Sequence, residues 1–191
     1  MSALRSLCVF CGSSVGNHQD YALLARELGS CLAEAGITLV YGGGKVGLMG
    51  AVADATLAAG GRVLGVMPEH LVQQEIAHTG LSELHVVSSM HERKETMAAL
   101  SDGFIALPGG AGTFEELFEQ WTWAQLGIHD KPCALLNAKG YFGPLLAMIG
   151  SMVEEGFMKS AYRDMLIVSD QPAALIERLA NYLPPPPKWA K

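Results

Sequence analysis

Short apolar stretches alternate along this chain with longer stretches in which apolar residues recur at helical spacing. The short stretches predict strands at residues 7–11, 38–41, 62–67, 84–87, 104–107 and 133–136, and residues 165–168 offer a seventh. The longer ones predict helices near residues 20–35, 48–59, 91–100, 113–126, 143–155 and 172–182. We therefore expect an α/β fold, a three-layer sandwich with a central parallel sheet of six to seven strands and helices on both faces.

Three of the predicted strands run into loops rich in glycine or serine. These loops are Gly12-Ser13-Ser14 after the first strand, Gly42-Gly43-Gly44 after the second and Pro108-Gly109-Gly110 after the fifth. Ligands of open α/β sheets bind at the carboxyl ends of the strands, which share one edge of the sheet. Any one loop is explained equally well by a tight turn or close helix packing. The three together, with hydroxyls from Ser13, Ser14 and Thr113, favour a nucleotide pocket.

The third loop continues into a predicted helix as Ala111-Gly112-Thr113-Phe114-Glu115-Glu116. A strand that ends in glycines before a helix leaves backbone amides free to bind an anion. Within that helix the apolar residues at positions 114, 117, 118 and 121 predict the face that meets the core. Glu115 lies on the flank of this face and Glu116 lies away from it. The two glutamates are either helix-dipole charges or acids of an active site, and the spacing leaves open which of them faces a substrate.

The second loop also fits the pattern G-x-G-x-x-G over residues 42–47. A dinucleotide site requires this pattern after the first strand, with an acidic residue about 20 positions later. Here the loop follows the second strand, and Met67 stands where the acid is required. A P-loop is disfavoured too, because Val46 follows Lys45 in place of a magnesium-binding Ser or Thr.

Arg93 and Lys94 begin the helix predicted after the fourth strand. Cations are disfavoured at a helix N-terminus, so the pair is either a solvated surface pair or a group that reaches over the strand edge to a phosphate or ribose. His91 and His129 are scattered single histidines, for which we predict no catalytic role.

Composition narrows the classes of partner. The 191 residues carry a net charge of −6 with scattered lysines and arginines, so we expect no nucleic-acid partner. No apolar run approaches the ~18 residues of a membrane span, so we expect a soluble, cytoplasmic protein without a membrane partner.

We predict one domain over residues 1–183 and a proline-rich tail over residues 184–191. Cys8 and Cys11 form C-x-x-C inside a predicted strand, which favours buried filler over a redox or zinc site.

Taken together, these motifs resemble the LONELY GUY family of cytokinin riboside 5′-monophosphate phosphoribohydrolases, often mislabelled as lysine decarboxylases. The resemblance runs from Leu7 to about Phe157. It is carried by the three loops, by Gly47-Leu48-Met49-Gly50 after the second loop, by Met90-His91-Glu92-Arg93-Lys94 and by Trp123-Ala124-Gln125-Leu126-Gly127. It implies a Rossmann-like fold, and it implies release of free base and ribose 5-phosphate from a nucleoside 5′-monophosphate.

The resemblance also implies roles for individual residues. The family signature P-G-G-x-G-T-x-x-E falls on residues 108–116, which assigns the essential glutamate to Glu116 and the essential arginine to Arg93. A further set is implied to line the substrate pocket: Glu75, Lys94, Gly109, Gly110, Ala111, Gly112, Thr113, Phe114 and Glu115, with Thr122 as a weaker assignment. The loop residues Gly12, Ser13, Ser14, Gly43 and Gly44 complete the predicted site. Ala111 departs from plant members of the family, which carry tyrosine there, so base preference is expected to differ.

In this interpretation a carboxylate stabilises an oxocarbenium-like state and activates water. Glu116 is our candidate for that role. Glu115 either binds the ribose hydroxyls or takes part in the same step. No metal and no cofactor is expected, the partner is a small nucleoside monophosphate, and the family suggests a homodimer. The rival hypotheses are a nucleotide sensor without catalysis and a dinucleotide oxidoreductase.

Overall fold

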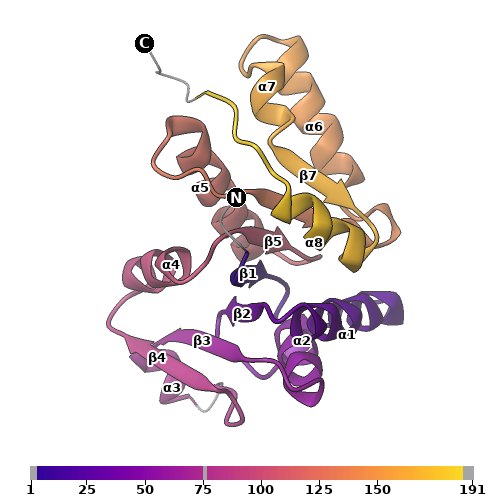
Figure 1. Cartoon of the computed structure of the whole chain (residues 1–191). Coiled ribbons are helices and arrows are strands. Elements are labelled where there is room, and N and C mark those ends of the chain that lie inside the picture. The colour runs from indigo at the N-terminus through magenta and orange to yellow at the C-terminus, as the bar shows by residue number, and fades with distance from the viewer. Residues whose placement is uncertain (1–3, 75–76, 187–191) are drawn as a thin grey trace.

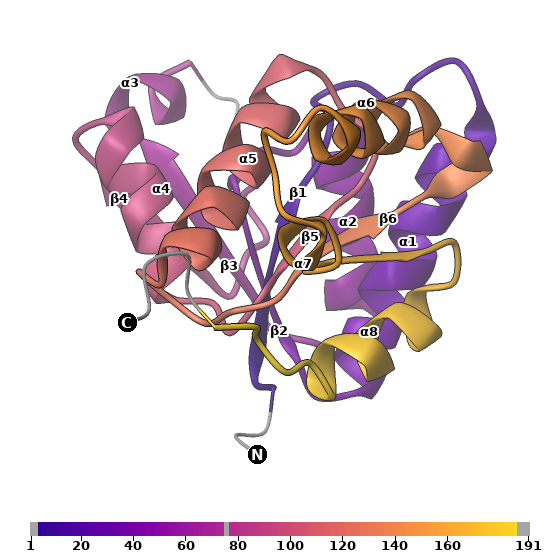
Figure 2. The same cartoon turned by 90° about the horizontal axis from the view of Figure 1, so that it is seen from above.

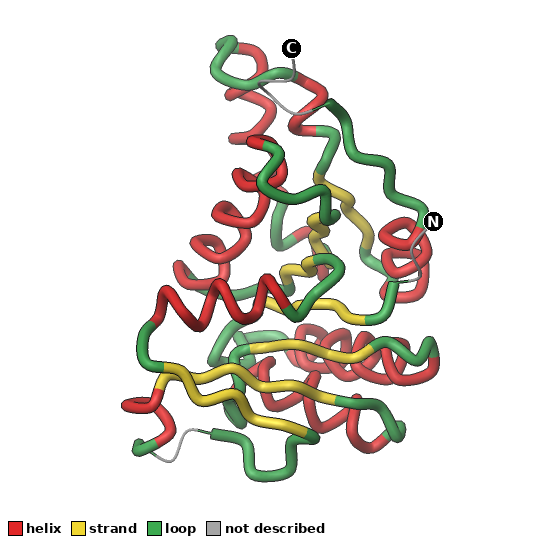
Figure 3. Tube along the Cα trace, turned by 60° about the vertical axis from the view of Figure 1, so that its left-hand side comes forward, coloured by secondary structure: helices red, strands yellow, loops and turns green. Residues whose placement is uncertain are grey.

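The computed structural model describes residues 4–74 and 77–186, and they form one seven-stranded sheet in the order β4-β3-β2-β1-β5-β6-β7. All six neighbouring pairs of strands run parallel, and the strands lie in one twisted row (Figure 3). The strands are β1 (Ser6–Phe10), β2 (Thr38–Tyr41), β3 (Val63–Pro68), β4 (Glu83–Val87), β5 (Phe104–Ala106), β6 (Cys133–Leu136) and β7 (Leu166–Ser169).

The helices cover both faces of the sheet, as Figures 1 and 2 show. They are α1 (Gln19–Glu34), α2 (Gly47–Ala58), α3 (Glu69–Val72), α4 (Met90–Ala99), α5 (Ala111–Leu126), α6 (Gly143–Glu154), α7 (Ser160–Arg163) and α8 (Pro172–Ala180), with a 3₁₀ turn η1 (Ala138–Gly140). The predicted Rossmann-like sandwich is confirmed. The turns α3, η1 and α7 were not predicted, because three or four residues are too few to show a helical period.

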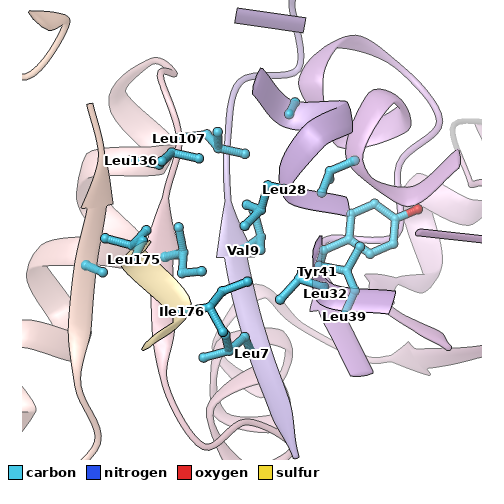
Figure 4. Close-up of a cluster of buried hydrophobic side chains, with 14 of the residues drawn as sticks. Leu7, Val9, Leu28, Leu32, Leu39, Tyr41, Leu107, Leu136, Leu175 and Ile176 are labelled. Atoms are coloured by element: carbon cyan, nitrogen blue, oxygen red, sulfur yellow. The ribbon is translucent and has the colours of Figure 1, made fainter. Parts of the chain in front are cut away.

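The central strands supply two hydrophobic cores, because successive side chains point to opposite faces of a sheet. Leu7 and Val9 of β1 pack with α1, α2 and α8, and Figure 4 shows this cluster. Cys8 and Phe10 of the same strand pack with α4, α5, α6 and α7. The five strands from β3 to β6 in the sheet order are buried on both faces, which is why they are nearly continuous apolar runs in the sequence, whereas the edge strand β4 is partly exposed.

β1 and β5 are neighbours in the middle of the sheet, and the strand order reverses between them. Chain connections on either side of this switch point leave toward opposite faces, so a crevice opens above the carboxyl ends of these strands. The fold therefore places the β1–α1 loop and the β5–α5 loop at the position where α/β proteins bind their ligands. The helices of the described residues include none long and apolar enough to cross a membrane.

Candidate active site

The three glycine-rich loops meet at Gly12, directly above the switch point. The Gly12 amide donates a hydrogen bond to the Pro108 carbonyl at 3.0 Å, and the Leu48 amide donates to the Gly12 carbonyl at 3.0 Å. The second loop ends at Gly47, which has a φ of +63° and leaves no room for a Cβ atom against the Ser13 backbone. The structure thus confirms that the loops share one edge of the sheet.

A cavity of about 360 Å³ lies beside this junction, and we call it the Glu116 cavity. It is lined by the end of β1, by the loops after β1, β2 and β5, by the first turns of α5, and by residues of α2 and α4. The side chains and loop residues around it include Cys11, Gly12, Ser13, Gly42, Met49, Arg93, Met97, Gly110, Ala111, Gly112, Thr113 and Glu116. Eight of the predicted site residues are therefore brought together in one place.

A second cavity of about 310 Å³ shares Gly12, Ser13 and Gly110 with the first, and we call it the Tyr141 cavity. Ser14 and Gly109 line this second cavity. The Tyr141 hydroxyl donates to the Gly109 carbonyl at 2.5 Å. Tyr141 lies in the segment after β6, and this hydrogen bond holds the third glycine loop in place.

The Glu116 cavity holds an ion pair between Arg93 on α4 and Glu116 on α5. Arg93 Nη1 donates to Glu116 Oε1 at 3.2 Å, and each side chain is 13% exposed. Arg93 Nε donates to the Val66 carbonyl on β3, also at 3.2 Å. The guanidinium is therefore held in place from two sides, and the interpretation of Arg93 and Lys94 as a solvated surface pair is wrong.

Burial raises the pKa of Glu116 above the ordinary value of a glutamate. The nearby Arg93 charge lowers this pKa, and the charge of Glu115 raises it again. Burial dominates because the carboxylate loses most of its water and gains one cation in return. A carboxyl group with a raised pKa, paired with an arginine in a cavity, is typical of a catalytic acid or base.

The N-terminus of α5 supplies the anion-binding part of the cavity. Gly110 is the N-cap, and its carbonyl accepts from the amides of Thr113 and Phe114 at 3.1 and 3.3 Å. The Ala111 and Gly112 amides precede the first intrahelical partner and line the cavity. Amides at a helix N-terminus favour phosphate, and the buried Thr113 adds a hydroxyl beside them.

Lys94 lies next to Arg93 but turns toward α5 and away from the cavity lining. Its Nζ donates to Glu115 Oε1 at 2.6 Å and to Glu119 Oε1 at 2.9 Å, and the Lys94 side chain is 12% exposed. The hydrogen bond to Glu115 is the main reason that the pKa of Lys94 is raised. Glu115 itself is 55% exposed, so the structure separates the two glutamates: Glu116 faces the cavity and Glu115 faces solvent.

The remaining predicted site residues lie outside the lining of both cavities. Gly43 and Gly44 are buried behind Gly42, Phe114 is half-buried against Tyr141, and Thr122 is exposed on α5. Glu75 lies outside the described residues. The roles of these residues, like those of Lys94 and Glu115, stay predictions from the resemblance.

Tyr21, Met97 and Tyr141 also line the two cavities, and no motif in the sequence pointed to them. Each is an apolar or aromatic residue of the kind that fills cores, and its place at the cavity follows only from the folded loops. Cys8 and Cys11 are free thiols, and burial raises the pKa of both, which favours the interpretation as filler. Among the described residues no group of three or more His, Cys, Asp or Glu is placed to hold a metal ion.

Comparison with known proteins gives a family match over most of the chain. The family model described as "Possible lysine decarboxylase" matches residues 49–179. The probable cytokinin riboside 5′-monophosphate phosphoribohydrolase LOGL2 of Oryza sativa subsp. japonica is 51% identical over 183 residues, which are 96% of this chain and 75% of LOGL2. The cytokinin riboside 5′-monophosphate phosphoribohydrolase LOG1 of Arabidopsis thaliana is 48% identical over 183 residues, 96% of this chain and 86% of LOG1.

Solved structures share the fold at lower sequence identity. The molybdenum cofactor carrier protein of Chlamydomonas reinhardtii has a TM-score of 0.71 and 22% identity, covering 94% of this chain and 99% of its own. The DNA processing protein A of Helicobacter pylori has a TM-score of 0.56 and 16% identity, covering 95% of this chain and 83% of its own. These likenesses concern the arrangement of sheet and helices alone.

Proposed function

This chain belongs to the LONELY GUY family of cytokinin riboside 5′-monophosphate phosphoribohydrolases. We propose that it hydrolyses the N-glycosidic bond of a nucleoside 5′-monophosphate, such as a cytokinin riboside 5′-monophosphate or AMP. The products are the free base and ribose 5-phosphate. One observation carries this proposal: Glu116, with a raised pKa, and Arg93 share a cavity with the amides at the start of α5.

The chemistry divides between the two ends of the nucleotide. The Ala111 and Gly112 amides and the Thr113 hydroxyl bind the 5′-phosphate, since they combine a helix dipole with unpaired donors. Glu116 lies further along the same helix and acts at the anomeric carbon. Arg93 neutralises part of the negative charge that phosphate and glutamate bring into one cavity, and it fixes the direction of the carboxylate.

At the anomeric carbon, Glu116 stabilises the positive charge that develops as the bond from C1′ to the base nitrogen breaks. The bonding electron pair leaves with the base. Water adds to C1′, and Glu116 accepts the proton that the water loses. The departing base nitrogen takes up one proton, so water is divided between the two products, ribose 5-phosphate and the neutral free base. Burial of Glu116 makes it a stronger base than a solvated glutamate, and this suits proton transfer near neutral pH.

The description of the family model, a possible lysine decarboxylase, fits this site poorly. Pyridoxal-dependent decarboxylation uses a lysine that forms a Schiff base with the cofactor. The residues that line the Glu116 and Tyr141 cavities include no lysine within the described chain. Lys94, the lysine next to Arg93, is engaged with Glu115 and Glu119.

We further propose that the active form is a homodimer in the cytoplasm. Large apolar side chains on and after α6 support the assembly, because Met148 and Phe157 are exposed in the single chain. Trp121 is buried and donates to the Tyr162 carbonyl at 3.0 Å, so its side chain is not available for such an interface. Light scattering at micromolar concentration tests the dimer, and a monomeric mass contradicts it.

A panel of nucleotides tests the proposed activity. The purified protein is incubated with AMP, ADP, ATP and the 5′-monophosphates of N6-substituted adenosines, and free base is measured by chromatography. We expect base release from monophosphates alone. Binding of AMP by calorimetry without any base release would contradict the enzyme and indicate the sensor. Binding of NAD with no effect of AMP would indicate the oxidoreductase.

A further inference from the structure

Gly42 is the first residue of the second glycine loop and lines the Glu116 cavity. From the sequence, the glycines of this loop serve either a tight turn and close helix packing or a nucleotide pocket. Gly42 has no positive φ, so its backbone conformation is open to any residue. The reason for a glycine at this position must therefore be space.

The space is occupied by the end of the Arg93 side chain. A Cβ atom at Gly42 would overlap Arg93 Nη2 and would lie 3.3 Å from Arg93 Cζ. On the same side, the Met49 sulfur lies 3.5 Å from that position. Arg93 Nη2 thus packs against the backbone of Gly42, directly after β2. Arg93 Nε donates to the Val66 carbonyl on β3, and Arg93 Nη1 donates to Glu116 on α5.

A rigid group is held at this place. The guanidinium is planar, and a displacement of Nη2 also tilts Nε and Nη1 away from their acceptors. Both hydrogen bonds are already 3.2 Å long, near the outer limit of a good N–H···O bond, so a small displacement breaks them. A methyl group at Gly42 has no free volume to enter without moving Arg93.

We propose that Gly42 is a positioning residue for base release. Because Gly42 has no side chain, the Arg93 guanidinium has the space it needs to reach Glu116. This inference rests on the proposed function and adds a role for the second loop. Gly42 acts through Arg93, so its contribution depends on the arginine being present.

The test begins with Gly42→Ala, compared with Gly150→Ala in α6, where a new Cβ meets no heavy atom within 4 Å. We expect Gly42→Ala to lower kcat by roughly 100-fold, as for a catalytic group displaced by about 1 Å. The acid limb of the pH profile of kcat/KM should also move to higher pH, because Arg93 lowers the pKa of Glu116. Gly150→Ala should leave both unchanged. Wild-type kcat and pH profile in Gly42→Ala would overturn the proposal.

The same substitution in an Arg93→Lys background separates positioning from loop folding. Lysine has no group that corresponds to Nη2, so the methyl group has nothing to displace. We expect Gly42→Ala to add little to the loss already caused by Arg93→Lys. An equal fold loss in both backgrounds would mean that the methyl group disturbs the loop itself, and the proposal would be overturned.

A stability cycle tests the contact without relying on catalysis. Thermal unfolding is measured for wild type, Gly42→Ala, Arg93→Ala and the double variant. We expect Gly42→Ala to lower Tm by a few degrees in the wild-type background and not in the Arg93→Ala background. Additive changes in Tm would overturn the contact. If the wild type released no base from any nucleotide, the proposed function would fail. The changes in Tm would still show whether Gly42 makes room for the Arg93 side chain.

Discussion

Arg93 and Glu116 form an ion pair at 3.2 Å across the cavity at the switch point of the sheet, although 23 positions separate them in the sequence. One side chain comes from α4 and the other from α5, and Arg93 also donates to the Val66 carbonyl of β3. The ion pair places a carboxylate with a raised pKa beside the amides of α5. The predictions that follow depend on this relationship.

Arg93→Ala should lower kcat/KM for base release by roughly 10²- to 10³-fold, the usual effect of removing one preorganised donor from an active site. The variant should stay folded, because Glu116 can take up a proton when its cation is lost. Circular dichroism checks the fold, and chromatography of free base checks the rate. Arg163→Ala is a suitable control, since that arginine pairs with its sequence neighbour Asp164 on the surface. Equal rates for Arg93→Ala and wild type would remove Arg93 from the mechanism.

The pH dependence of kcat/KM should report Glu116. The ionised carboxylate is the active form, and burial raises its pKa above the ordinary 4.5. Activity should therefore be full above this raised pKa and should fall as the pH drops through it. The measurement is an initial-rate profile between pH 4 and pH 8. An acid limb at or below 4.5 would be inconsistent with a buried catalytic carboxylate.

Lys94→Met should move the same acid limb to higher pH, because the Lys94 charge lowers the pKa of Glu116. The variant also leaves Glu119 without its cation, so the free energy of unfolding should fall by about 1 kcal/mol. Lys159→Met, at an exposed lysine before α7, serves as the control. An unchanged profile would show that Lys94 is too far from Glu116 to act on it.

Tyr141→Phe removes the hydroxyl that holds the Gly109 carbonyl and keeps the aromatic ring. Loss of one hydrogen bond costs about 1 kcal/mol, so KM for a nucleoside monophosphate should rise roughly fivefold with a smaller change in kcat. Tyr21→Phe keeps the ring that contacts Tyr141 edge-on and should change KM less. If both variants gave the same KM as wild type, the third glycine loop would be held without Tyr141.

Much of the fold follows from the sequence because its central strands are buried on both faces. Thr38–Tyr41 and Cys133–Leu136 are found at the predicted bounds, and the other strands differ by one residue at one or both ends. Helix α5 begins at Ala111, two residues before the prediction, because Gly110 serves as an N-cap without a side chain. The domain division, the cytoplasmic location and the homodimer stay predictions.

The candidate site was predicted less completely, because contacts between distant segments leave no local pattern. The helical period placed Glu116 away from the apolar face, and the structure shows that this side of α5 turns toward Arg93 and the cavity. Nothing in the sequence around Tyr141 indicates that its hydroxyl reaches back to Gly109. Lys94 pairs with Glu115 and Glu119 on α5, a contact that the sequence did not indicate, and its role at the pocket stays a prediction.

The central claim is that Glu116, rather than its neighbour Glu115, acts at the anomeric carbon. The direct test compares Glu116→Gln with Glu115→Gln for release of free base from a nucleoside 5′-monophosphate. We predict that Glu116→Gln loses roughly 10²- to 10⁴-fold in kcat while it still binds ribose 5-phosphate, and that Glu115→Gln keeps most of its activity. Full activity in Glu116→Gln, or a larger loss in Glu115→Gln, would contradict the account.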